Sequence, residues 1–313
     1  MKSARSSVLL RVAAIAMIIG VAIAADPLLA ATQGRRRPTP PPDQGKTAEP
    51  TVPAPKEVEK KAAGKTTQLQ LSPAETIVET TIFAYGGRKQ LDTVRASIEE
   101  DGNIRLATDQ GDLSGSYVLR SMRKEKTWLD LLRVDIELKP AETSSASAPS
   151  AIKYIIAYNG ASVWSAQNGQ YVNPRAEAET AFRAQMTHEY MALLRYKEDG
   201  SKLEMIGPET VVGVDTNVIG MTNPNGEKTR YWISTKTYRI VYAEYELQLG
   251  EKKAPTKYRL AYFYTPFRVV QGTLVPVRRV MTQDGKFVQE ITLGNINYTA
   301  KLDPEVFQHL QEQ

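Results

Sequence analysis

Six dipeptides in which Asn or Asp precedes Gly constrain the fold of this 313-residue chain more than any other feature. They lie at 101–102, 159–160, 168–169, 199–200, 225–226 and 284–285. Such pairs accept the positive φ angles of tight hairpin turns, so each of them favours two antiparallel strands joined by a short connection. The pattern therefore predicts a series of antiparallel hairpins over most of the chain.

Apolar and polar residues alternate between these turns. In one segment the apolar face consists of Leu132, Val134, Ile136 and Leu138, and the polar face of Arg133, Asp135 and Glu137. Another predicted face is Tyr258, Leu260, Tyr262 and Tyr264, and a third is Phe287, Ile291 and Leu293. A period of two is typical of half-buried strands. Roughly ten to twelve such segments are enough for a large antiparallel sheet or an incomplete barrel.

A few helices interrupt the β pattern. Ser72 and Glu75 form a capping box with Pro73 at the first helical position, and Gly86-Gly87 ends that helix. A short helix is predicted at 88–94, and one long helix at about 176–196. The apolar stripe of the long helix is Phe182, Met186, Tyr190, Leu193 and Leu194. We expect this stripe to pack on the concave side of the sheet.

The N-terminus has the pattern of an export signal. Lys2, Arg5 and Arg11 precede an apolar run, and Ala22-Ile23-Ala24 is a small-x-small cleavage site. The sequence thus predicts a signal peptide at 1–24, with a second cleavage position as late as 31, and a periplasmic location. An uncleaved membrane anchor is the weaker alternative. Residues 25–70 are Pro-rich with almost nothing to bury, which predicts a disordered linker.

Charge and cysteine content exclude several classes of protein. The net charge of +5 is concentrated in the first 70 residues, which leaves about −1 for residues 71–313. We therefore expect one folded domain at 71–313 that does not bind nucleic acid. The chain has no cysteine, so a disulfide framework and a lipid-modified N-terminal Cys are both excluded.

Catalytic motifs are missing from the sequence. It contains no nucleophile elbow, no HExxH and no phosphate-binding loop. The two histidines are His188, expected on the solvated side of the long helix, and His309, expected in a frayed tail. We therefore predict no catalytic residue, metal ion or cofactor, and a protein that is not an enzyme. A hydrolase that uses two carboxylates is the least favoured alternative.

A wide curved sheet covered by one helix leaves space for an apolar cavity, the usual site for a lipid-like ligand. The alternative is a fully packed core in which the aromatic residues only fill volume. The candidate ligand-binding residues are Trp164, Phe182, Met186, Tyr190, Tyr258, Leu260, Tyr262, Tyr264 and Phe287.

The order of motifs along 71–313 resembles the outer-membrane lipoprotein carrier family of the LolA type and its LolB, LppX and RseB-like relatives. The matching segments are Ala84–Gly87 with a first strand that ends at Asp101-Gly102, then Tyr158–Gly160 with Trp164, Tyr231–Tyr238, Tyr264–Pro276 and Ile296–Phe307. Ser234 stands where the family pattern has Asp, and the Pro-rich linker is not part of that pattern.

This resemblance implies an incomplete barrel of about eleven antiparallel strands that encloses an apolar cavity, with helices as a lid. It further implies a soluble, monomeric periplasmic carrier that binds the acyl chains of lipids or lipoproteins for transfer toward the outer membrane. The implied protein partners are an inner-membrane donor and an outer-membrane acceptor. An RseB-like envelope lipid sensor is the alternative function.

Overall fold

The structure is a computed structural model that describes residues 71–94, 96–108, 111–124, 129–140, 151–249, 254–262 and 267–309. The predicted signal peptide at 1–24, the predicted linker at 25–70 and the candidate residue Tyr264 lie outside these ranges. Those predictions therefore stay predictions.

Strands dominate the described chain, and thirteen of them form one antiparallel sheet in the order β6-β5-β4-β3-β2-β1-β15-β14-β11-β10-β9-β8-β7. Their bounds are β1 (Ser97–Leu106), β2 (Leu113–Met122), β3 (Leu131–Pro140), β4 (Ile152–Tyr158), β5 (Val163–Gln167), β6 (Gln170–Val172), β7 (Lys202–Val211), β8 (Val214–Thr222), β9 (Lys228–Ser234), β10 (Ile240–Leu247), β11 (Thr256–Ala261), β14 (Arg278–Gln283) and β15 (Lys286–Asn297). A separate hairpin consists of β12 (Phe267–Val270) and β13 (Thr273–Pro276).

The helices are α1 (Pro73–Ala84), α2 (Arg88–Val94), α3 (Ala176–His188), α4 (Tyr190–Leu194) and the 3-10 helix η1 (Pro304–Phe307). The predicted capping box at Ser72 and Glu75 is confirmed, and α1 ends before Gly86 and Gly87, both of which have positive φ. In the described part of the chain, no helix is both long and apolar enough to cross a membrane.

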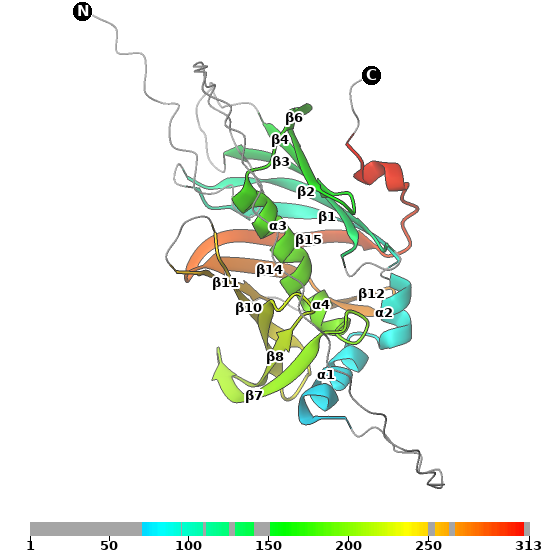
Figure 1. The fold of residues 1–313 in the computed structure, drawn as a ribbon, viewed down its shortest axis with the longest axis vertical. Helices are drawn as coiled ribbons and strands as arrows, with labels where there is room; N and C mark the ends of the chain where they lie inside the picture. Colours follow the sequence, from blue (N-terminus) through cyan, green and yellow to red (C-terminus); the bar gives the residue numbers. More distant parts are fainter. Residues whose placement is uncertain are drawn as a thin grey trace, which may run out of the picture. The chain divides into compact units, whose positions relative to one another are not determined.

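The sheet consists of two meanders joined by α3 and α4. Strands β1 to β6 follow one another, the chain then crosses the sheet through α3 and α4, and β7 to β11 form the second meander (Figure 1). Strand β15 pairs with β1 on one side and β14 on the other, so it connects the two halves. The edge strands β6 and β7 are not paired with each other. The predicted incomplete antiparallel barrel with helices is confirmed, with thirteen strands in place of about eleven.

Four of the six predicted turns join consecutive strands: 159–160, 168–169, 225–226 and 284–285. The other two predictions are wrong. Asp199-Gly200 lies between α4 and β7, and Asp101-Gly102 lies in the middle of β1, where the register against β15 shifts by a bulge. Gly102 is needed there for close packing, because an added Cβ would meet the backbone of Thr292 and Gly294.

The two faces of the sheet have separate cores. The inner face, which α3 and α4 cover, holds the large cluster that includes Ile136, Tyr154 and Leu260. The outer face carries two smaller apolar clusters, one around Trp232 and one around Trp164. The predicted alternation in β3 is confirmed, since Leu132 and Val134 pack against the inner core and the charged residues between them lie on the outer face.

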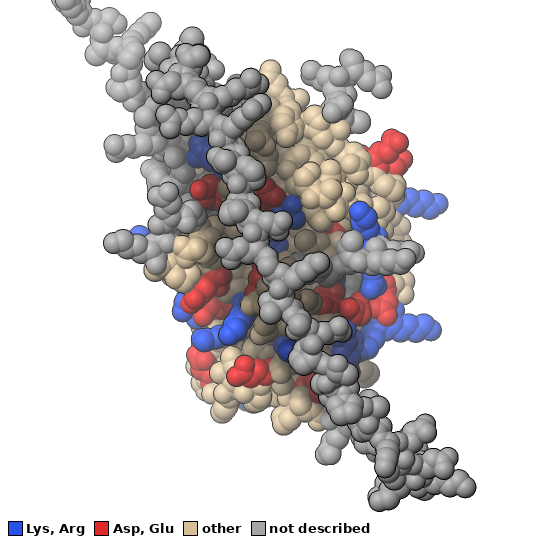
Figure 2. Space-filling model, viewed as in Figure 1, with Lys and Arg blue, Asp and Glu red and all other residues tan. Residues whose placement is uncertain are grey.

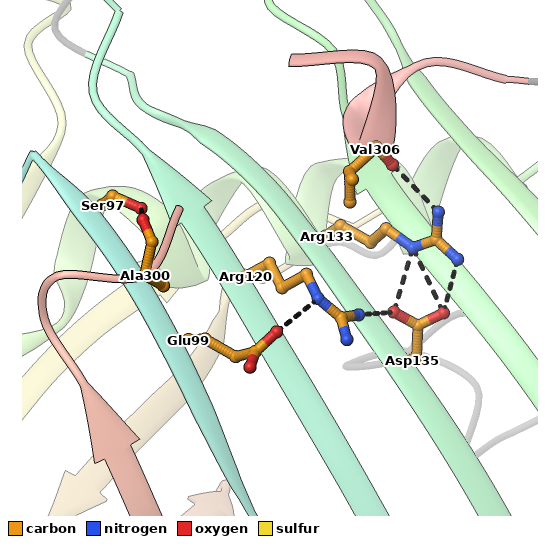
Figure 3. Close-up of polar contacts among 7 residues, drawn as sticks. All are labelled: Ser97, Glu99, Arg120, Arg133, Asp135, Ala300 and Val306. Atoms are coloured by element: carbon orange, nitrogen blue, oxygen red, sulfur yellow. Dashed lines mark hydrogen bonds and ion pairs between the residues drawn. The ribbon is translucent and has the colours of Figure 1, made fainter. Parts of the chain in front are cut away.

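An ion-pair ladder crosses the outer face of β1, β2 and β3 (Figure 3). Arg120 Nε lies 2.7 Å from Glu99 Oε2, and its Nη1 lies 2.9 Å from Asp135 Oδ2. Arg133 pairs with the same Asp135 at 2.7 Å and donates to the carbonyl of Val306 at 2.9 Å. This ladder attaches η1 to the outer face of the sheet.

Aromatic contacts hold the end of η1 and the residues after it on the same face. Trp164 Nε1 donates to the carbonyl of Phe307 at 2.8 Å, and Phe307 is fully buried. The centroid of the His309 ring lies 5.4 Å from the ring centroid of Trp164 and 4.5 Å from that of Tyr171. His309 is therefore packed against the sheet, and its predicted place in a frayed tail is wrong.

We predict that Gly102→Ala destabilises the domain by about 2 kcal/mol, because the new methyl group has to displace backbone atoms of β15. Gly220→Ala in β8 is the matched control, since the nearest atoms to its methyl group are side-chain atoms, Ile206 Cδ1 at 3.3 Å and Glu204 Cβ at 3.8 Å, and not backbone. Urea unfolding monitored by circular dichroism measures both. Equal stability of the two variants would contradict the close approach at Gly102.

Candidate functional site

A pocket of about 150 Å³ lies on the inner face, between strands β1 to β3 and the helices α3 and α4. Its apolar wall includes Ile98, Leu119, Leu132, Val134, Met186 and Met191. The sheet contributes this wall through the inward side of its two-residue period, and α3 and α4 contribute the two methionines. The pocket is therefore bounded by the rigid sheet on one side and by helices on the other.

Two of the candidate ligand-binding residues, Met186 and Tyr190, line this pocket. Phe182, Tyr258, Leu260 and Tyr262 are buried in the inner core without lining it. Of these four, Phe182 lies on α3 and the others lie at β11 or directly after it.

Trp164 and Phe287 lie in the outer-face clusters and not at the pocket. Phe287 was predicted to share a face with Ile291 and Leu293, and this prediction is wrong. The register of β14 against β15 shifts between Met281 and Thr282, so the intervening Val288 moves Phe287 to the opposite side. A bulge of this kind cannot be read from alternation alone.

The inner face beside the pocket is filled by stacked aromatic rings. Tyr245 stacks on His188 with ring centroids 4.2 Å apart and on Tyr258 at 5.4 Å. Tyr190 packs edge-on against Tyr262 at 5.4 Å. The packed-core alternative thus describes the β10–β11 half of the inner face, whereas the pocket occupies the β1–β3 half.

The predicted single helix at 176–196 is two helices, α3 and α4, because Glu189 between them is extended with ψ of 165°. Tyrosine hydroxyls satisfy backbone groups freed by this break. The Tyr231 hydroxyl donates to the carbonyls of His188 at 3.3 Å and Glu189 at 3.2 Å. The Tyr190 N–H donates to the Tyr262 hydroxyl at 3.3 Å. The break is therefore held in place by the core beneath it.

His188, at the end of α3, is 1% exposed, so its predicted position on a solvated helix face is wrong. Its Nδ1 lies 2.6 Å from Thr229 Oγ1, and its Nε2 has no hydrogen-bond partner within the described ranges. Burial lowers the pKa of His188 to about 4. The ring is therefore neutral at pH 7.

A buried charged group lies at the pocket wall. The Tyr117 hydroxyl donates to Glu100 Oε1 at 2.6 Å, and Arg279 forms an ion pair with the same carboxylate. Arg279 Nη1 also lies 3.8 Å from Glu189 Oε2, which places the extended residue of the helix break at this cluster. Burial opposes the charge of Arg279, but the attraction of Glu100 outweighs it and raises the pKa of Arg279 well above its usual value.

A second charged group lines the same pocket. Arg195, directly after α4, pairs with Asp130 Oδ2 at 2.5 Å and with Asp199 Oδ2 at 3.2 Å. Its side chain is 14% exposed. The other carboxylate oxygen of Asp130, Oδ1, is buried and has no hydrogen-bond partner in the described part of the chain. This pocket therefore contains one acceptor that no neighbouring donor satisfies.

These charged residues are not among the candidates predicted from the sequence, although two of them interrupt the apolar alternation. Glu100 follows Ile98 on the inward side of β1, and Arg279 precedes Met281 on the inward side of β14. Strand β15 separates β1 from β14 in the sheet, so sequence alone did not bring the two residues together.

Comparisons with known proteins show the fold. No family model matches the chain, and no curated protein does. A DUF1329 family protein from Desulfovibrio piger is similar in structure, with 13% identity, a TM-score of 0.50, and coverage of 76% of this chain and 98% of that one. A putative outer membrane lipoprotein-sorting protein domain from Vibrio parahaemolyticus has 14% identity, a TM-score of 0.45, and coverage of 74% and 94%. The resemblance predicted from the sequence is thus confirmed as a likeness of fold.

We predict that His188 makes the domain less stable in mild acid. Its folded pKa of about 4 lies below the ordinary value of 6.5, so the unfolded chain takes up a proton that the folded chain excludes. Stability is therefore lost as the pH falls from about 6.5 toward 4, by about 2 kcal/mol at pH 5.

Urea unfolding of the wild type and His188→Gln between pH 7.5 and pH 5 tests this expectation. The variant should lose less stability over that range, because its side chain does not titrate. Parallel pH profiles for the two proteins would show that His188 is not the group responsible.

Proposed function

We propose that the domain at 71–313 binds an acyl chain in the pocket between β1–β3 and α3–α4, and that it serves as a periplasmic carrier of lipids or lipoproteins. The observation that carries this proposal is the pocket itself, with an apolar sheet wall facing Met186 and Met191. Methionine side chains are flexible and polarizable, so they adapt to acyl chains of different shape.

The size of the pocket sets a condition on binding. Its volume of about 150 Å³ is below the roughly 300–1,000 Å³ of pockets that enclose drug-sized ligands. The sheet wall is fixed by backbone pairing on both sides, whereas α3 and α4 meet at the extended Glu189. A long acyl chain therefore requires the helices, and not the sheet, to shift outward.

The cellular side of the proposal depends on the N-terminal sequence. The predicted signal peptide at 1–24 favours export to the periplasm, where a carrier of acyl chains collects its cargo from one membrane and delivers it to another. An inner-membrane donor, an outer-membrane acceptor and a monomeric state belong to the same proposal. We further propose that the protein acts by binding and not by catalysis.

Charges of both signs are interspersed on the face of the molecule shown in Figure 2. This distribution agrees with the small net charge of residues 71–313 and favours recognition of the cargo inside the pocket over attraction to a charged surface.

Ser121→Phe tests the pocket, because Ser121 is a small residue in its wall and the new ring fills space without removing a core side chain. We expect this variant to lose binding of 1-decanol by tenfold or more and to keep its thermal stability. Ser116→Phe is the control, since Ser116 lies on the exposed opposite side of the same strand. Displacement of a fluorescent apolar probe measures affinity.

The same assay with 1-octanol, 1-decanol and 1-dodecanol tests whether the alkyl chain is buried. Each buried methylene contributes about 0.8 kcal/mol, so affinity should rise by roughly tenfold for every two methylenes until the pocket is full. Because these ligands are uncharged, their affinities measure the burial of the alkyl chain against the apolar wall. If none of them binds, or if Ser116→Phe weakens binding as much as Ser121→Phe, the pocket is not an acyl site.

A further inference from the structure

We propose that the natural ligand of this pocket carries a cationic hydrogen-bond donor, such as an ammonium group, next to its apolar chain. This inference rests on the proposed function, because it names the class of amphiphile that the acyl pocket accepts. Its basis is the set of carboxylates that line the pocket together with the apolar wall.

Carboxylates outnumber cations at the pocket. Four acidic side chains line it, Glu100, Asp130, Glu189 and Asp199, against two arginines, Arg195 and Arg279. Both arginines are already paired, Arg195 with two aspartates and Arg279 with Glu100. With all four carboxyl groups ionised, the lining has a formal excess of two negative charges, although burial raises the pKa of Glu189 and so opposes its charge. Neither arginine is free to receive an anionic head group.

Two carboxylate groups at the pocket, those of Glu189 and Asp130, could accept further hydrogen bonds. Glu189 Oε2 approaches Arg279 Nη1 only at 3.8 Å, and the Glu189 side chain is 29% exposed. Asp130 Oδ1, by contrast, is buried and has no hydrogen-bond partner among the described residues. Burying a polar atom without a partner is unfavourable unless a donor arrives, and a ligand ammonium group supplies up to three.

The position of Glu189 is itself fixed by the fold. Its extended backbone interrupts what would otherwise be one helix, and Tyr231 and Tyr262 satisfy groups freed by the break. Glu189 lies at that break and lines the pocket beside the methionine wall. An amphiphile with its chain against the methionines thus brings its head group to this carboxylate.

Attraction of a cation at such a place is strong compared with a surface contact, because opposite charges interact more strongly where water is partly excluded. A carboxylate head group meets the opposite situation, with repulsion from the excess negative charge and no unpaired arginine to bind it. The pocket should therefore discriminate between amphiphiles that share one alkyl chain and differ in the sign of the head group.

Three ligands with the same chain test this: decylammonium, decanoate and neutral 1-decanol, each titrated into the folded protein at pH 7 by calorimetry. We expect decylammonium to bind at least tenfold more tightly than decanoate, with 1-decanol between them. In Glu189→Gln, which keeps the shape and removes the charge, decylammonium should lose at least threefold in affinity while 1-decanol is unchanged.

Glu204→Gln on the exposed face of β7 is the matched control, because it removes the same charge away from the pocket and should alter none of the three affinities. Thermal melting verifies that both variants are folded. Equal affinities for the three ligands, or an equal change in affinity in the two variants, would overturn the inference. Neither result would contradict the proposed acyl site. Failure of 1-decanol to bind at all overturns the proposed function as well.

Discussion

The extended residue between α3 and α4 determines much of what the inner face can do. Without the break at Glu189, one straight helix would cross the sheet, and the two halves of the inner face would be covered alike. The Tyr231 and Tyr262 hydroxyls make the break tolerable, because they satisfy backbone groups that the helix no longer pairs. The same break buries His188 in the aromatic stack and places Glu189 beside Arg279.

The two halves of the inner face consequently have different roles. Stacked tyrosines from β10 and β11 fill the space under the end of α3, and such a packed region is rigid. Strands β1 to β3 instead face a pocket, and the outer side of the same strands is braced by the ladder from Glu99 to Arg133 and by η1 (Figure 3). The strands that line the pocket are thus held by contacts on their outer face, whereas the helical wall of the pocket is broken at Glu189.

Much of the fold could be predicted from the sequence because its determinants are local. The capping box at Ser72, the Gly pair after α1 and the Asn-Gly and Asp-Gly turns act within a few residues. Bulges are different, since they depend on the partner strand. Gly102 serves close packing against β15, and the bulge near Val288 turns Phe287 outward. The charged groups at the pocket were missed for the same reason, because strands far apart in sequence bring Glu100 to Arg279.

Charges at an otherwise apolar pocket are difficult to explain by stability alone. Well-packed apolar side chains often stabilise a core as well as a buried ion pair does, since removing charges from water is unfavourable. The cluster at Arg279 and the cluster at Arg195 nevertheless both lie at the pocket wall. Asp130 Oδ1 is buried without a partner among the described residues, and Glu189 meets Arg279 only at 3.8 Å. Placing unsatisfied acceptors beside an apolar surface gives the site two separate requirements, an alkyl chain and a donor. A ligand that meets both relieves the cost of the buried charges at the moment it binds, so affinity and head-group selectivity have one physical origin.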